Sequence, residues 1–300
     1  MTKYLNAAYG NRHVLAFRTE NGIVYADSLR KLTGKSYGSI NCVDDLCRDP
    51  ENAKLIAADI VTNSNRLVSA TINGEEVKHL PCVLHPGKIV CIGLNYRKHA
   101  METHAKVPEY PVVFSKFSDS VAAHRQDIAI KPDGWKVDYE AELGILIGRR
   151  AINVSRGNAL KFVFGYFPAN DVSARELQLR TSQWLLGKTC TGFAPIGPEV
   201  VTTDEVATPN NLRISCSVNG EMRQDSSTSD MIFKCDEIIS YCSQYFILEP
   251  GDIILTGTPE GVVLGMKEGT RKWIVPGDTV EVKIEGMSAL ENRFISIQGN

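Results

Sequence analysis

Two glutamates, Glu140 and Glu142, lie two residues apart at the start of an apolar run from Leu143 to Gly148. Side chains two residues apart on a strand share a face, and the bulky residues that follow indicate that this strand enters the core. Two like charges at such a place repel each other and resist dehydration, and a divalent cation relieves both costs. We interpret the pair as half of a metal site, although two solvated glutamates on an exposed edge are the simpler alternative.

A histidine and a carboxylate three residues apart form a second candidate group. His99 and Glu102 follow the apolar run Ile89–Gly93, and on a helical turn they would be neighbours. A carboxylate beside an imidazole fixes its tautomer and raises its basicity, as a general base acting on water requires. Taken alone, the pair also fits an ion pair on the surface of a helix.

The segment after Asn170 contains polar residues at helical spacing. Asp171, Arg175 and Gln178 share a face if the stretch from Val172 is helical, with Asn170 or Asp171 as its cap. Asp171 would then be a third metal carboxylate, and the other two would reach the substrate. The simpler interpretation is an N-cap and a helical ion pair worth about 0.3–0.5 kcal/mol.

Two later turns add weaker signals. Lys188 follows a glycine in a turn, where its ammonium could hold a carboxylate as a point charge. Thr258 lies in the turn Thr256–Pro259 after an apolar strand, and small residues there let the backbone approach a ligand. A solvated lysine and an ordinary tight turn remain the alternatives.

The elements that must position these residues are mostly short strands. Many strands separated by Pro-Gly turns, with few helices, predict an α+β, β-rich fold, a roll rather than a parallel α/β sheet. Residues 1–80 read as a small N-terminal α+β domain with a hairpin at Glu20–Gly22. Prolines from Pro81 onward mark the boundary, and residues 81–300 carry every candidate residue.

Composition excludes several classes of protein. A hydrophobic content of 43% in 300 residues allows a core of normal size, and a net charge of -2 does not favour nucleic acid or an acidic membrane surface. No apolar run is long enough to span a bilayer, and the first residues lack the apolar segment of a signal peptide. The 8 cysteines form no Cys-x-x-Cys pair, so we expect free thiols in a reducing, cytoplasmic setting.

Five segments, taken together and in this order, resemble the fumarylacetoacetate hydrolase family. The resemblance covers the chain from about Pro81 to its C-terminus. Each segment is weak alone, but the five in this order are specific. They are Ile92–His99, Asp138–Leu143, Asn170–Arg175, Gly187–Lys188 and Leu255–Pro259.

The resemblance implies a fold, a cofactor and a set of roles. The family fold is a mixed β-sandwich roll, usually in a homodimer. Ile92 occupies the position where larger members of the family have a fourth acidic ligand, so the chain is similar to the three-carboxylate branch. The implied ligands of one Mg²⁺ or Mn²⁺ are Glu140, Glu142 and Asp171. The implied catalytic residues are His99, Glu102 and Lys188, and the implied substrate pocket contains Arg175, Gln178, Lys188 and Thr258.

Two places depart from the usual family pattern. Val262–Val263 replaces a common Val-Gly, and Ala122–Gln126 replaces a common Gly-Pro turn. We expect both in loops that touch the substrate, so they affect the expected specificity rather than the metal site.

The expected function is divalent-metal-dependent hydrolysis of a carbon–carbon bond in a 1,3-diketo acid, such as an acylpyruvate or fumarylpyruvate, through a metal-stabilised enolate. The same enolate chemistry would also serve an oxaloacetate decarboxylase, or an isomerase or decarboxylase of a 2-hydroxydiene diacid. The alternative of another class is a non-catalytic metal-binding protein. The expected partners are a small keto acid and a second copy of the chain, without nucleic acid or membrane.

Overall fold

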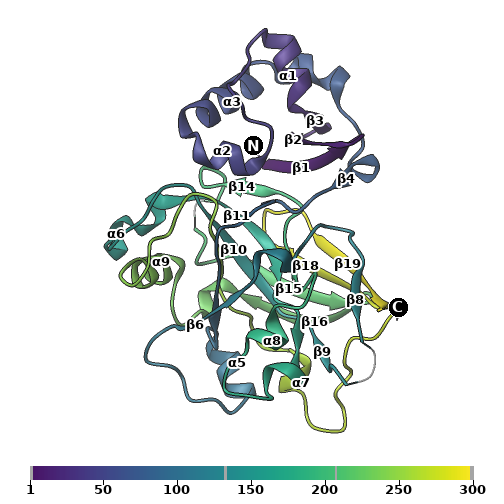
Figure 1. Ribbon diagram of the computed structural model, residues 1–300, viewed down its shortest axis with the longest axis vertical. Helices are drawn as coiled ribbons and strands as arrows, with labels where there is room; N and C mark the ends of the chain where they lie inside the picture. The colour runs from purple at the N-terminus through teal and green to yellow at the C-terminus, as the bar shows by residue number, and fades with distance from the viewer. Residues whose placement is uncertain (1–2, 132–133, 207, 298–300) are drawn as a thin grey trace.

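One large sheet runs through the whole molecule (Figure 1). The computed structural model describes residues 3–131, 134–206 and 208–297. The strand order is β3-β2-β1-β14-β11-β10-β17-β5-β6, and β4 pairs with β1. The strands are β1 (Lys3–Tyr9), β2 (Arg12–Thr19), β3 (Gly22–Tyr25), β4 (Lys78–His79), β5 (Ile89–Gly93), β6 (Val112–Lys116), β10 (Ala141–Ile147), β11 (Val163–Asn170), β14 (Val200–Thr202) and β17 (Ile253–Leu255).

A second, five-stranded sheet packs against the central strands of the first. Its strands are β16 (Glu221–Ser227), β15 (Arg213–Val218), β18 (Thr279–Ile284), β19 (Leu290–Ser296) and β8 (Ile128–Ile130), in that order. Val280, Val282 and Ile284 alternate inward along β18 and share a core with Ile145 and Ile147 of β10. All seven residues of β10 are buried, as expected for a strand between two layers. The expected α+β, strand-rich sandwich roll is therefore confirmed.

Most helices lie at the two ends of the molecule, whereas α6 and α9 lie beside the central strands (Figure 1). The N-terminal helices lie at the top of Figure 1, and α5, α7 and α8 gather near the opposite end. They are α1 (Ala26–Thr33), α2 (Val43–Arg48), α3 (Pro50–Thr62), α4 (Ser64–Leu67), α5 (Arg97–Glu102), α6 (Arg156–Ala159), α7 (Arg175–Gln178), α8 (Leu185–Lys188) and α9 (Cys235–Ser243). Four short strands complete the fold: β7 (Val121–Ala122), β9 (Val137–Asp138), β12 (Ser173–Ala174) and β13 (Ala194–Pro195).

Local predictions had mixed outcomes. The hairpin at Glu20–Gly22 is confirmed, because β2 pairs with β3 across that turn. The helix expected from Val172, with Asn170 or Asp171 as its cap, is wrong. β11 continues to Asn170, and the next residues pair with β9 as strand β12, so the helix begins only at Arg175.

The N-terminal part is joined to the rest by the large sheet. Tyr4 of β1 pairs with Val200 of β14, so the sheet continues across the boundary expected near Pro81. The division into 1–80 and 81–300 stays a prediction, and its outermost residues, 1–2 and 298–300, lie outside the described part of the chain.

Two histidines, one from each part, pack together at the junction between the N-terminal part and the rest of the chain. The rings of His79 and His124 pack edge to face with centroids 5.1 Å apart, and Arg125 donates to Glu75 at 2.9 Å. Burial lowers the pKa of His79 to about 4 and that of His124 to about 3. Glu199 opposes the shift of His79, whereas the nearby arginines reinforce both shifts. Both side chains are therefore neutral in the folded protein at neutral pH.

This arrangement predicts a pH-dependent stability. An unfolded histidine binds a proton below about pH 6.5, whereas these two remain neutral in the folded chain to about pH 4. The unfolded state therefore binds more protons, and the free energy of unfolding should fall as the pH drops from about 6.5 towards 4. In His124→Asn, whose amide oxygen can still accept the Glu291 N–H, urea unfolding should show a smaller fall.

The exposed His104→Asn substitution is the matched control, because asparagine tolerates the positive φ of that position. It should leave the pH dependence unchanged. Identical pH dependence in the wild type and His124→Asn would contradict the buried, neutral state of His124.

Candidate metal centre and active site

Three buried carboxylates converge where β10 begins and β11 ends. Ala141 pairs with Asn170, so the residues just outside this pair, Glu140 and Asp171, lie side by side. The Asp171 N–H donates to the Glu140 carbonyl at 2.9 Å. One oxygen from each of Glu140, Glu142 and Asp171 lies within 4.8 Å of the others. The structure thus brings together the three residues expected as metal ligands, whose role as ligands stays a proposal.

Cationic side chains neutralise two of these acids. The Lys188 ammonium lies 2.7 Å from Glu140 Oε2 and 2.8 Å from Asp171 Oδ2. Arg175 Nη2 lies 2.7 Å from Glu140 Oε1 and 2.8 Å from Asp138 Oδ2. Burial alone would raise the pKa of Glu140, but the Lys188 and Arg175 charges outweigh it and hold that pKa at about 2. Glu140 is therefore ionised.

Lys116 and Asp138 also belong to the cluster, and the sequence analysis gave them no role. The Lys116 ammonium pairs with Asp171 and donates to the Val172 carbonyl at 3.2 Å. Asp138 accepts the backbone N–H groups of Val263 and Leu264 at 2.9 and 3.0 Å. Asp138 carried a signal, because it lies two residues before Glu140 and so on the same strand face. Nothing in the sequence links Lys116 to Asp171, 55 residues away.

Glu142 differs from the other acids in its surroundings. Four carboxylates, with Asp138 included, face three cationic side chains, so one negative charge would stay uncompensated if all four acids were ionised. Among the described residues, no lysine or arginine pairs with Glu142, whose Oε2 accepts the Gly257 N–H at 2.7 Å. Burial and the charges of Asp171 and Glu140 raise its pKa well above the usual range. Without a cation this raised pKa favours the protonated form of Glu142, and a hard divalent cation bound by the three acids would take the place of that proton.

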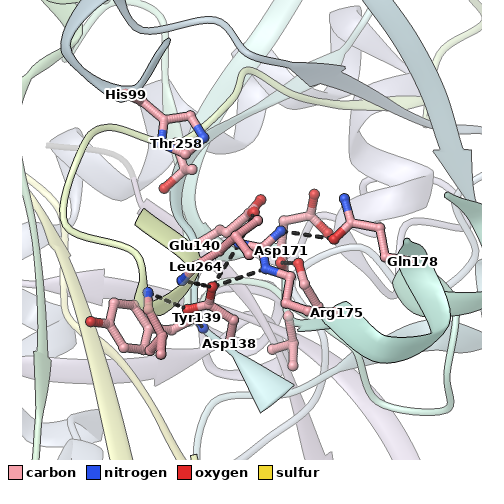
Figure 2. Close-up of polar contacts among 12 residues, drawn as sticks. His99, Asp138, Tyr139, Glu140, Asp171, Arg175, Gln178, Thr258 and Leu264 are labelled. Atoms are coloured by element: carbon pink, nitrogen blue, oxygen red, sulfur yellow. Dashed lines mark hydrogen bonds and ion pairs between the residues drawn. The ribbon is translucent and has the colours of Figure 1, made fainter. Parts of the chain in front are cut away.

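A cavity of about 190 Å³ is lined by two of these acids, Glu140 and Glu142. Gln178 also lines it, and so do His99 and Thr258, which lie on the other side of the gap in Figure 2. His99 Nδ1 lies 2.9 Å from Glu102 Oε1, as the sequence analysis expected. Because the Glu102 carboxylate can only accept, we assign the proton to Nδ1, which leaves a lone pair on Nε2.

The Glu102 carboxylate also contacts the segment from Gly261 to Gly265. Its second oxygen accepts the Gly261 N–H at 2.9 Å. A Cβ on Gly265 would lie 2.5 Å from the Glu102 carboxyl carbon, so only glycine leaves room for the carboxylate there. These contacts fix the orientation of the pair formed by His99 and Glu102.

The residues expected to bind substrate lie at the cavity, but several are already engaged. Arg175 Nη1 donates to Gln178 Oε1 at 2.8 Å, and the rest of the guanidinium faces acids (Figure 2). Asp171 does not share a helix face with these two, because α7 begins at Arg175. Lys188 lines the cavity, but its ammonium pairs with Glu140 and Asp171, which are carboxylates of the protein rather than of a substrate.

The two segments that depart from the family pattern lie outside the lining of this cavity. Of the described residues, those lining the cavity include neither Ala122–Gln126 nor Val262–Val263. His124 and Arg125 line a separate cavity of about 300 Å³ against the N-terminal part. Val263 supports the site from outside through its N–H bond to Asp138. The expectation that these loops touch the substrate therefore finds no support in the cavity lining.

Residues 88–295 match the family described as "Fumarylacetoacetate (FAA) hydrolase C-terminal". The chain belongs to this family. It is accordingly an enzyme, and the alternative of a non-catalytic metal-binding protein is not supported.

Named relatives show several activities within the family. An oxaloacetate tautomerase of Rattus norvegicus is 42% identical over 221 residues, which are 73% of this chain and 70% of that protein. A fumarylacetoacetate hydrolase from Exiguobacterium antarcticum is 28% identical with a TM-score of 0.80, covering 99% of this chain and 100% of that one. A 2-hydroxyhepta-2,4-diene-1,7-dioate isomerase from Mycobacterium marinum is 27% identical with a TM-score of 0.74, and both chains are covered completely, at 100%.

Among the described residues, no helix has both the length and the apolar character needed to cross a bilayer.

The surroundings of Glu142 predict an unusual mutant. Glu142→Gln removes a proposed ligand but retains an oxygen for the Gly257 N–H. Without metal it should melt no lower than the wild type, because a neutral amide replaces a carboxyl group whose charged form is disfavoured by burial and by the nearby acids. It should also lose the rise in melting temperature that we expect Mg²⁺ to give the wild type.

The exposed Glu221→Gln substitution is the control and should retain the Mg²⁺ response. Thermal unfolding with and without Mg²⁺ measures both effects. If Mg²⁺ still raised the melting temperature of Glu142→Gln, Glu142 would not be a metal ligand.

Proposed function

We propose that the protein catalyses keto–enol tautomerisation of oxaloacetate or a similar small 2-oxo dicarboxylic acid, with Mg²⁺ or Mn²⁺ held by Glu140, Glu142 and Asp171. The size of the cavity is the observation that favours a small dicarboxylic acid as the substrate. Its volume of about 190 Å³ is smaller than the roughly 300–1,000 Å³ of pockets for drug-sized ligands, and so suits a four-carbon acid. The name of the rat relative, oxaloacetate tautomerase, supports the same substrate.

The charge around the cavity supports an anionic substrate. A second cavity of about 180 Å³ shares Arg175, Leu179 and Leu264 with the first. Its other walls include the basic residues Lys136, Arg180 and Arg271 and one acid, Glu176, which pairs with Lys136 at 3.0 Å. A cluster of basic side chains beside the site raises the local concentration of a dianion and speeds its encounter with the cavity.

The residues of the chain divide the chemistry between them. A bound divalent cation supplies Lewis-acid stabilisation of an enolate oxygen. His99 Nε2 takes a proton from the carbon next to the ketone as that C–H bond breaks, and it delivers the proton to the enolate oxygen, which gives the enol. Glu102 stabilises the imidazolium that forms between the two transfers. Lys188 has a third N–H beyond the two that face Glu140 and Asp171, and this N–H can donate to the substrate.

A second candidate is the hydrolysis of a 1,3-diketo acid, the reaction that we expected first. The observation that favours it is the oriented pair of His99 and Glu102, because the same Nε2 could take a proton from water. Decarboxylation of oxaloacetate and isomerisation of a 2-hydroxydiene diacid use the same enolate stabilisation, and the M. marinum neighbour bears the name of such an isomerase.

Two further expectations remain proposals. A homodimer is supported by the edge strand β6, which exposes Val113, and by the exposed Phe117 and Leu186. A reducing, cytosolic setting is supported by eight cysteines that are all free. The rat relative is named as a mitochondrial protein, so cell fractionation is the direct test.

The tautomerase proposal is tested by the UV absorbance of enol-oxaloacetate as it converts to the keto form with protein and Mg²⁺. His99→Asn should lower the rate by about 10²–10⁴-fold, because the proton carrier is lost. The Mg²⁺-dependent rise in melting temperature should remain, since His99 is not among the proposed ligands.

His104→Asn, at an exposed histidine nearby, is the matched control. An undiminished rate in His99→Asn would contradict its role in proton transfer. A wild-type protein that cleaves an acylpyruvate but does not tautomerise oxaloacetate would replace the first candidate with the second.

A further inference from the structure

A buried glutamine joins the proposed ligand strand to the turn that contains Thr258. Gln224, on β16, is 1% exposed. Its Oε1 accepts the Ala141 N–H at 3.0 Å. Its Nε2 donates to Thr258 Oγ1 at 2.9 Å and to the Pro259 carbonyl at 2.9 Å. The two ends of one amide thus contact two parts of the active site.

These partners leave the Gln224 amide one orientation. The Ala141 N–H can only donate, so the amide oxygen must face it. The Pro259 carbonyl can only accept, so the amide nitrogen must face the turn. With the amide reversed, a donor would oppose a donor and an acceptor would oppose an acceptor in a buried place, which is costly.

This orientation determines what Thr258 can offer. A free hydroxyl can donate or accept in either direction. Thr258 Oγ1 already accepts from Gln224, and among the described residues its hydroxyl donates to no protein group. The side chain is 4% exposed and lines the cavity. The hydrogen of this hydroxyl is therefore available to an acceptor inside the cavity.

We propose that Gln224 is a positioning residue that makes Thr258 a hydrogen-bond donor towards the cavity, and that it thereby selects ligands with an anionic oxygen there. In the proposed function, on which the substrate class rests, that oxygen is a carboxylate or enolate oxygen of the 2-oxo acid. A ligand with an N–H or O–H donor at the same position would oppose the hydroxyl hydrogen and bind weakly.

A purely structural role is the competing explanation. Gln224 contacts the backbone between Glu140 and Glu142, so its loss could weaken binding by moving those acids. The two explanations differ in one respect. If Gln224 acts through Thr258, its effect on ligand binding disappears when the Thr258 hydroxyl is absent, whereas a structural effect persists.

A double-mutant cycle on oxalate binding makes this distinction. Oxalate is a small planar dianion that resembles an enolate of a 2-oxo acid, and titration calorimetry with Mg²⁺ present measures its affinity without turnover. Thr258→Val should weaken binding by about tenfold or more, as for a lost hydrogen bond to a charged group, and Thr258→Ser should not. Gln224→Met should weaken binding in the wild type and have no further effect in Thr258→Val.

Gln224→Glu provides a second variant that retains the shape of the side chain. Its carboxylate still accepts the Ala141 N–H, but it draws the Thr258 hydrogen away from the cavity, so oxalate should again bind about tenfold or more weakly. Losses that multiply fully in the double variants, or unchanged binding in both Gln224 variants, would overturn the proposal. A wild type that does not bind oxalate with Mg²⁺ would overturn it as well.

The proposed function fails separately. If the wild type binds oxalate but does not tautomerise oxaloacetate, the tautomerase proposal is lost. The cycle still decides the role of Gln224 in that case.

Discussion

The burial of several carboxylates within reach of one another is the constraint on which the rest of the structure depends. Glu142 and Asp171 are 1% and 0% exposed, and ions taken out of water cost several kcal/mol each unless charges and hydrogen bonds compensate them. Lys116, Lys188 and Arg175 compensate most of this charge but none of it directly at Glu142. The negative charge of an ionised Glu142 would therefore be compensated by the divalent cation that we propose, and that cation would support the proposed enolate chemistry.

The backbone keeps this cluster in place from several elements. The pairing of β10 with β11 brings Glu140 beside Asp171, and the turn after β17 brings the Gly257 N–H to Glu142. Gly257 has a φ of 97°, and a Cβ there would lie 2.7 Å from Asn95 Cβ. A side chain would push this turn away from the acid that it supports. The same turn presents Thr258 to the cavity, so the proposed metal ligands and the proposed substrate contacts share one support.

Local patterns predicted the residues whose partners are near in sequence. The alternation of a strand placed Glu140 with Glu142, and the spacing of a helical turn placed His99 with Glu102. Helical spacing suggested Asp171 as a third carboxylate and the resemblance implied it as a ligand, but the helix assumed around it was wrong because tertiary pairing keeps the segment extended as far as Ala174. Lys116 was missed because alternation along a strand cannot show which distant acid a side chain meets. The continuation of the large sheet into the N-terminal part was missed for the same reason, since pairing between β1 and β14 has no local signal.

The location of the cation tests the central claim most directly. A crystal of the protein soaked in Mn²⁺ would show the ion by its anomalous scattering. The account predicts one strong peak per chain, bounded by the carboxylates of Glu140, Glu142 and Asp171. A map without a peak there, or with its only peak at other residues, would contradict the account.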